Sequence, residues 1–265
     1  MNVQFFCPRW GSEGISWSDF TKRVKDAGYD GIEWGLAHTT TDRELEEAWN
    51  CAAKHGLGMI PQHYDTNDAH FQRHKDAYEA WLQRMSIYPA VKLNSQTGKD
   101  FFHFGQNWQL IQIGNKYGAV HETHRGKFSY AAHTTKTYLE EIPELRLTLD
   151  ISHWVCVAES LLDDQPEAVN LAIERADHLH ARLGHPEAPQ VTDPREPEWL
   201  MVFERHLEWW DRVAARIQTE GKVLTITPEF GPYPYMVRLP VTGEPIADQW
   251  EVNRYMMGIL RKRYG

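Results

Sequence analysis

Four side chains in the second half of the sequence combine metal-binding with acid–base chemistry. Each stands near the end of a short apolar run: Glu122, Asp150, His180 and Glu229. Carboxylates that converge in a site of low dielectric repel one another, so one keeps a proton or a cation lies between them. Carboxylate oxygens and an imidazole suit one divalent ion such as Mn²⁺, Co²⁺, Mg²⁺ or Zn²⁺. Such an ion can polarise a carbonyl, and a nearby carboxylate can then move a proton between adjacent carbons.

Each of the four also has an ordinary structural explanation. Glu122 could pair with a basic neighbour, and Asp150 could cap a turn. His180 could be a core histidine with both nitrogens satisfied, and Glu229, which follows a proline, could be a surface turn residue. The functional interpretation therefore depends on finding all four on consecutive apolar runs.

Two other histidine patterns lead to different chemistry. His178, His180 and His185 could form a local zinc cluster, but no cysteine or further ligand is near them in the sequence. The "HETH" of residues 121–124 is not the zincin motif, because its histidines are three positions apart rather than four.

The elements that position these residues form a repeating pattern of apolar runs and helical spacing. The runs cover residues 3–7, 31–36, 57–63, 90–95, 119–124, 145–151, 177–183 and 223–230. Helical spacing is clear over 16–27, 41–55, 69–85 and 197–219, weak over 105–117 and undefined over 154–175. Eight strands alternating with helices predict an α/β fold, a (β/α)8 TIM barrel that forms a single domain over residues 1–265. A doubly wound sheet is the main alternative, but the sequence has no Gly-rich nucleotide-binding motif.

Composition narrows the classes of partner. The chain has 28 Lys and Arg against 37 Asp and Glu, a net charge of −9, which disfavours binding to a phosphate backbone. Its 3 cysteines are widely spaced, so no disulfide framework is implied and a reducing compartment is expected. The first ten residues show no signal-peptide pattern, and no run approaches the ~20 apolar residues of a membrane helix. These features predict a cytoplasmic protein without a membrane partner.

The order of elements and the residues at the strand ends resemble the xylose isomerase-like TIM barrels, the sugar phosphate isomerase/epimerase superfamily. The resemblance spans nearly the whole chain, and "DGIEWG" at residues 30–35 resembles the signature of the family's second strand. The element order is specific, whereas the individual motifs are short and degenerate.

This resemblance implies roles for particular residues. Glu122, Asp150, His180 and Glu229 would bind one divalent metal ion, and the two glutamates would also act as the acid–base pair. His153 would contact a substrate oxygen, or bind a metal ion as in family members that hold several ions. His63, after the third strand, would be a pocket histidine.

Three more residues could contact the substrate. Arg182 lies near the end of the seventh run and His185 follows that run, and the alternatives for the two are a rim salt bridge and an exposed histidine. Trp10, which follows the first run, could meet a substrate ring or simply pack. The Pro-rich segments 184–199 and 230–245 are predicted as rim loops, and the second could form a pocket wall or a subunit interface. The second segment therefore leaves a homo-oligomer as one possible state of the protein.

The implied function is divalent-metal-dependent isomerisation or epimerisation of a sugar, polyol or keto compound through an enediolate. A lyase or dehydratase resembling inosose dehydratase would use the same residues. An endonuclease IV-like nuclease is disfavoured by the acidic net charge, and a catalytically inactive binding barrel by the presence of all four ligands. The expected partner is a small-molecule carbohydrate rather than nucleic acid.

Overall fold

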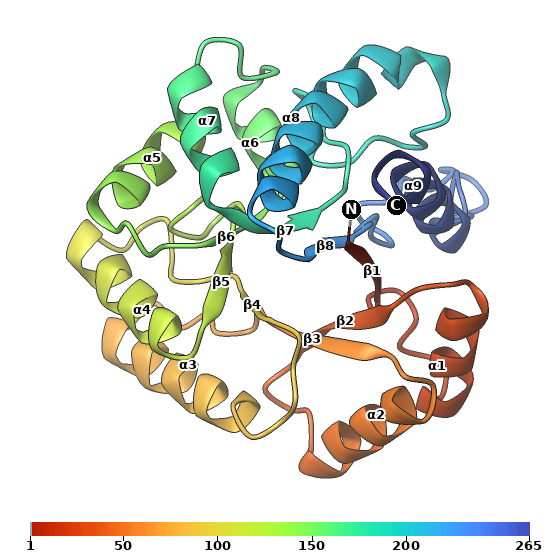
Figure 1. Ribbon diagram of the computed structural model, residues 1–265, viewed down its shortest axis with the longest axis horizontal. Helices are drawn as coiled ribbons and strands as arrows, with labels where there is room; N and C mark the ends of the chain where they lie inside the picture. The colour runs from red at the N-terminus through yellow and green to blue at the C-terminus, as the bar shows by residue number, and fades with distance from the viewer. Residues whose placement is uncertain (1) are drawn as a thin grey trace.

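The computed structural model describes residues 2–265 and confirms the predicted barrel. Eight parallel strands close into one barrel, in which each strand pairs with the next and β8 pairs with β1 (Figure 1). The strands are β1 (Val3–Pro8), β2 (Gly31–Leu36), β3 (Gly58–His63), β4 (Leu93–Ser95), β5 (Ala119–Glu122), β6 (Leu147–Leu149), β7 (Ala176–His180) and β8 (Leu224–Thr227). All strands therefore point their carboxyl ends to the same side.

The helices surround the barrel (Figure 1). They are α1 (Trp17–Asp26), α2 (Asp42–Lys54), α3 (Phe71–Met85), α4 (Phe104–Lys116), α5 (Ala132–Glu141), α6 (Ile151–Ala158), α7 (Pro166–Arg175), α8 (Leu200–Thr219) and α9 (Gln249–Tyr264), with a 3-10 turn at Pro197–Trp199. None of the helices within residues 2–265 is long and apolar enough to cross a bilayer.

Local sequence signals explain where several helices begin. The predicted capping box of α2 is present, since the Thr41 hydroxyl accepts from the Glu44 backbone and the Glu44 side chain accepts from the Thr41 backbone. Asp150 is the N-cap of α6, because its Oδ1 accepts from the Ser152 backbone at 3.1 Å. Asp150 therefore has the capping role that was its alternative explanation. The cap uses Oδ1, whereas Oδ2 pairs with Arg182.

Some boundaries differ from the sequence prediction. The fifth and sixth strands end at Glu122 and Leu149, earlier than the apolar runs suggested. The undefined segment 154–175 contains parts of α6 and all of α7. Helices α5 and α9 had no predicted counterpart, because three threonines in α5 and a mid-helix glycine in α9 weaken the local helical signal. Packing against the barrel outweighs those propensities.

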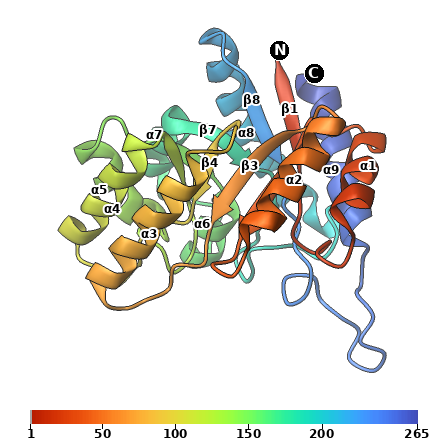
Figure 2. The same cartoon turned by 90° about the horizontal axis from the view of Figure 1, so that it is seen from below.

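The segment between β8 and α9 extends furthest from the barrel body, on the side of the strand carboxyl ends (Figure 2). Part of it forms a short hairpin, in which Ile246 N donates to Val237 O at 3.0 Å and Leu239 N donates to Glu244 O at 2.8 Å. This predicted rim loop is therefore partly ordered by its own backbone hydrogen bonds.

His206 in α8 illustrates how a buried histidine makes stability depend on pH. Its Nδ1 donates to Val202 O at 2.8 Å, and its Nε2 accepts from Gly184 N at 3.3 Å, so both nitrogens are satisfied in the neutral form. Burial lowers the pKa of His206 to about 4. The unfolded chain therefore takes up the proton first as the pH falls, and the free energy of unfolding falls between about pH 6.5 and pH 4.

We expect His206→Gln to reduce the loss of free energy of unfolding between pH 7 and pH 4.5 by about 2 kcal/mol. The measurement is urea unfolding of both proteins at pH 7 and pH 4.5. Because other buried histidines contribute equally to both proteins, the difference between them isolates His206. Parallel stability curves for the two proteins would contradict this explanation.

Candidate metal and acid–base site

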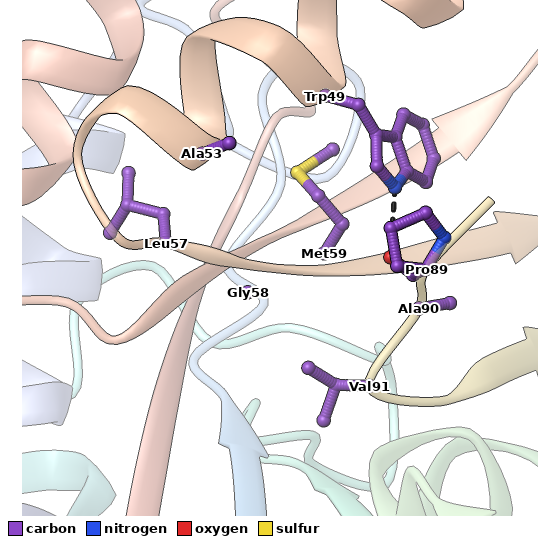
Figure 3. A pocket seen from close by; sticks show the side chains of 8 residues that line it. All are labelled: Trp49, Ala53, Leu57, Gly58, Met59, Pro89, Ala90 and Val91. Carbon is purple, nitrogen blue, oxygen red and sulfur yellow. Dashed lines mark hydrogen bonds between the residues drawn. The ribbon is translucent and has the colours of Figure 1, made fainter.

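A cavity of about 780 Å³ lies at the carboxyl ends of the strands. Its polar lining includes residues at the carboxyl ends of β3, β5, β7 and β8: Gln62, Glu122, Arg182 and Glu229. Five aromatic side chains also line it: Trp10, Trp17, Trp34, Tyr64 and Tyr235. A smaller hollow of about 310 Å³, at the start of β3, is lined by apolar residues and contains no titratable side chain (Figure 3). The polar cavity is therefore the candidate functional site.

The structure brings the four predicted residues together at the base of this cavity. Glu122 and His180 end β5 and β7, Asp150 directly follows β6, and Glu229 lies two residues beyond β8. One nitrogen or oxygen atom from each of the four lies within 4.8 Å of those of the other three. All four residues are buried, with Glu229 the most exposed at 6%.

His180 supplies the observation that tests whether a cation fits. Its Nδ1 is buried and makes no hydrogen bond, yet it lies 3.0 Å from Glu229 Oε2, 3.7 Å from Glu122 Oε1 and 4.0 Å from Asp150 Oδ2. An imidazole nitrogen with no hydrogen bond among three carboxylate oxygens is a donor set suited to a divalent ion. The residues present therefore fit the predicted metal.

The pKa values of the cluster support the same conclusion. Burial, with the neighbouring Glu229 and Asp150 charges, raises the pKa of Glu122 to about 8. Burial alone would lower the pKa of His180, but the surrounding carboxylates raise it well above its usual value. Without a cation, this cluster holds a proton near neutral pH. A divalent ion would replace that proton and balance the remaining charge.

Arg182 provides part of the positive charge that the carboxylates need. It is 1% exposed, forms a short ion pair with Asp150 through Nη2, and its Nη1 lies 3.7 Å from Glu229 Oε2. The predicted rim salt bridge is thus a buried one. Since Glu33 adds a fourth buried carboxylate nearby, one guanidinium leaves the site with excess negative charge.

Side-chain amides from β3 and β4 hold Glu122 in place, and the sequence prediction missed them. Gln62 Nε2 donates to Glu122 Oε2 at 2.8 Å and to Glu229 Oε1 at 3.4 Å. Asn94 Nδ2 and Gln96 Nε2 each donate to Glu122 at 3.3 Å. The sequence signal that could have found them is a polar residue at the carboxyl end of an otherwise apolar strand.

His153 lies beside the cluster rather than in the cavity lining. Its Nδ1 accepts from Arg125 Nε at 3.1 Å, and its Nε2 lies 2.8 Å from Arg182 Nη2. Burial, with the charges around it, lowers the pKa of His153 well below its usual value. A substrate contact by His153 stays a prediction.

The other predicted substrate residues divide into two groups. Trp10 and Arg182 line the cavity, and the Trp10 ring packs edge-on against Tyr235 at 5.2 Å. His63 instead faces α3, where it packs against Tyr78 and Trp81, and it is outside the cavity lining. Since the β3 run ends with His63 directed outward, Gln62 takes the inward position. This placement of His63 does not support its prediction as a pocket histidine.

His185 lies in the loop after β7, where its ring packs against Trp199 at 4.8 Å. It is outside the cavity lining, so its prediction as a substrate contact gains no support. The predicted zinc cluster is not formed either, because His185 does not join the groups of potential ligands that contain His178 and His180 in residues 2–265.

No family model and no curated protein matches this chain. Among solved structures, one described as "The crystal structure of AsfvAP:AG" aligns over 99% of both chains with a TM-score of 0.57 and 11% identity. A mandelate racemase/muconate lactonizing enzyme-like protein from Rubrobacter xylanophilus covers 94% of this chain and 62% of its own, with a TM-score of 0.49 and 12% identity. An endoglucanase from Bacteroides salanitronis covers 97% and 93%, with a TM-score of 0.46 and 10% identity. The similarity to the first of these three structures supports the barrel fold.

Proposed function

We propose that this protein is a divalent-metal-dependent isomerase or epimerase of a sugar or a related polyol or keto compound. The observation that carries the proposal is the buried His180 Nδ1, which has no hydrogen bond and lies among the carboxylates of Glu122, Asp150 and Glu229. These four residues would hold the ion at the base of the cavity. When bound, a divalent cation polarises a substrate carbonyl and stabilises negative charge on its oxygen.

Glu229 and Glu122 have the properties of a base and an acid. His180 and Arg182 outweigh the effect of burial on Glu229 and lower its pKa, so this carboxylate is ionised and can remove a proton. Glu122, the second glutamate of the cluster, would return a proton to the neighbouring carbon, and burial raises its pKa and so favours its protonation during that transfer. Removal of a proton beside a carbonyl gives an enediolate, and its return to a different carbon or face gives the isomer or epimer.

The cavity lining favours a neutral carbohydrate. Carboxylates outnumber guanidinium groups along the lining, which disfavours a phosphate or a nucleic-acid backbone. Trp10, Trp17, Trp34 and Tyr235 offer flat apolar faces that suit the C–H surface of a sugar. We therefore propose a small, unphosphorylated carbohydrate as the substrate. We also propose that the protein acts in the cytoplasm.

A test of this function is solvent exchange at carbon. Purified protein with Mn²⁺ would be incubated in D₂O with a panel of unphosphorylated ketoses and inososes, and NMR would follow deuterium incorporation beside the carbonyl. We expect incorporation in at least one substrate, with a rearranged product. Binding of Mn²⁺ without exchange in any compound of the panel would count against the proposal.

The same experiment separates the isomerase from a dehydratase that uses the same residues. Proton removal followed by loss of a β-hydroxyl would give an unsaturated ketone that absorbs in the near ultraviolet, whereas an isomer or epimer would not. A nuclease would instead cleave abasic DNA in the presence of added zinc.

A further inference from the structure

Glu33, the third residue of β2, is a buried carboxylate that has no assigned role in the proposed reaction. It is 3% exposed, and it accepts hydrogen bonds from Asn94 Nδ2 at 2.8 Å and from the Thr227 hydroxyl. Both of its oxygens also lie 3.1 Å from His180 Nε2. Glu33 therefore faces the side of the His180 ring that is opposite the other three carboxylates.

These contacts determine which nitrogen of His180 would keep its proton when a cation is bound at the other. Asn94 Nδ2 donates to Glu33 Oε1 and the Thr227 hydroxyl donates to Oε2, so both oxygens act as acceptors, as in an ionised carboxylate. An ionised carboxylate only accepts hydrogen bonds, and hence Nε2 of His180 must donate. A neutral imidazole that is protonated at Nε2 has its lone pair on Nδ1, the nitrogen that faces Glu122, Asp150 and Glu229.

We infer that Glu33 is a positioning residue that holds His180 in the Nε2-protonated tautomer and directs its Nδ1 lone pair towards the proposed cation. This inference rests on the proposed function, since it concerns the same metal site. A carboxylate that accepts from the outer nitrogen of a metal-binding histidine fixes the ring and increases its basicity. Glu33 would therefore increase cation affinity without touching the cation.

His178 shares Glu33 but does not compete for this role. Its Nε2 lies 3.1 Å from Glu33 Oε2, and its Nδ1 lies 2.8 Å from the Thr225 hydroxyl and 2.9 Å from the Thr225 carbonyl oxygen. Within residues 2–265, Glu33 is the carboxylate within ion-pair distance of His178, whereas His180 reaches four. His178 thus helps to hold Glu33 in place.

The test compares Mn²⁺ affinity of the wild type with that of Glu33→Gln by titration calorimetry. An amide of the same shape lacks the charge, and we expect the Kd for Mn²⁺ to rise about 10- to 100-fold. Glu208→Gln is the matched control, because it removes one negative charge from an exposed ion pair on α8. Its Kd should stay within twofold of the wild type. Equal affinity of Glu33→Gln and wild type would overturn the inference.

A second measurement does not require the Glu33→Gln variant to fold. In ¹⁵N-histidine-labelled wild type loaded with Zn²⁺, NMR should show His180 with a protonated Nε2 and a metal-bound Nδ1, assigned by its absence in His180→Asn. Zinc on Nε2, or a proton on Nδ1, would overturn the inference while leaving the metal site intact. Failure of the wild type to bind either ion would instead contradict the proposed function itself.

Discussion

Replacing Glu229 with glutamine is expected to lower kcat by about 10²- to 10⁴-fold on any substrate that the wild type converts. Glutamine has nearly the same shape, so the cavity and the Gln62 contact at 3.4 Å change little. It cannot accept the proton from carbon, however, and proton transfer is the step that the account assigns to Glu229. Glu122→Gln should lose a similar factor, because the return of the proton fails instead.

The measurement is deuterium exchange and product formation under saturating substrate and Mn²⁺. Glu140→Gln, an exposed residue at the carboxyl end of α5, is the control and should retain wild-type kcat. If Glu229→Gln turned over within tenfold of the wild type while Mn²⁺ remained bound, Glu229 could not be the base.

Arg182→Met is expected to lower the free energy of unfolding by about 3–5 kcal/mol in metal-free buffer. The substitution leaves Asp150, which is 0% exposed, without its ion-pair partner and removes a positive charge from a site rich in carboxylates. Added Mn²⁺ should recover part of this loss, since the ion replaces the missing charge. Urea unfolding in EDTA and in Mn²⁺ measures both effects.

The control for Arg182 is Arg254→Met, which removes a half-exposed ion pair with Glu251. Exposed ion pairs contribute less than about 1 kcal/mol to stability, so the free energy of unfolding of this variant should be close to that of the wild type. If Arg182→Met lowered the free energy of unfolding as little as Arg254→Met does, the buried Asp150 carboxylate would not need Arg182 as its ion-pair partner.

The fold could be predicted because its signal is repeated along the chain. Eight apolar runs each gave a strand, and the common direction of parallel strands placed Glu122, Asp150, His180 and Glu229 on one side. The boundaries were less predictable, since an apolar run continues into the loop or helix that follows. For this reason β6 ends at Leu149, and Ile151 belongs to α6.

The interactions around the four residues could not be predicted in the same way. A side chain's direction depends on the last residues of its strand, and His63 and Gln62 differ by one position yet face opposite sides. The contact of Glu33 with His180 joins residues 147 positions apart, across the barrel interior. Only the closed barrel brings these two groups together.

The proposed metal site is tested most directly by titration of metal-free protein with Mn²⁺, wild type beside Asp150→Asn. Asparagine keeps the shape of Asp150, so the variant should remain folded by circular dichroism while it lacks one of the three clustered carboxylates. We predict about one equivalent of Mn²⁺ bound by the wild type and at least tenfold weaker binding by the variant. No binding by the wild type, or equal binding by the two proteins, would contradict a metal site built from Glu122, Asp150, His180 and Glu229.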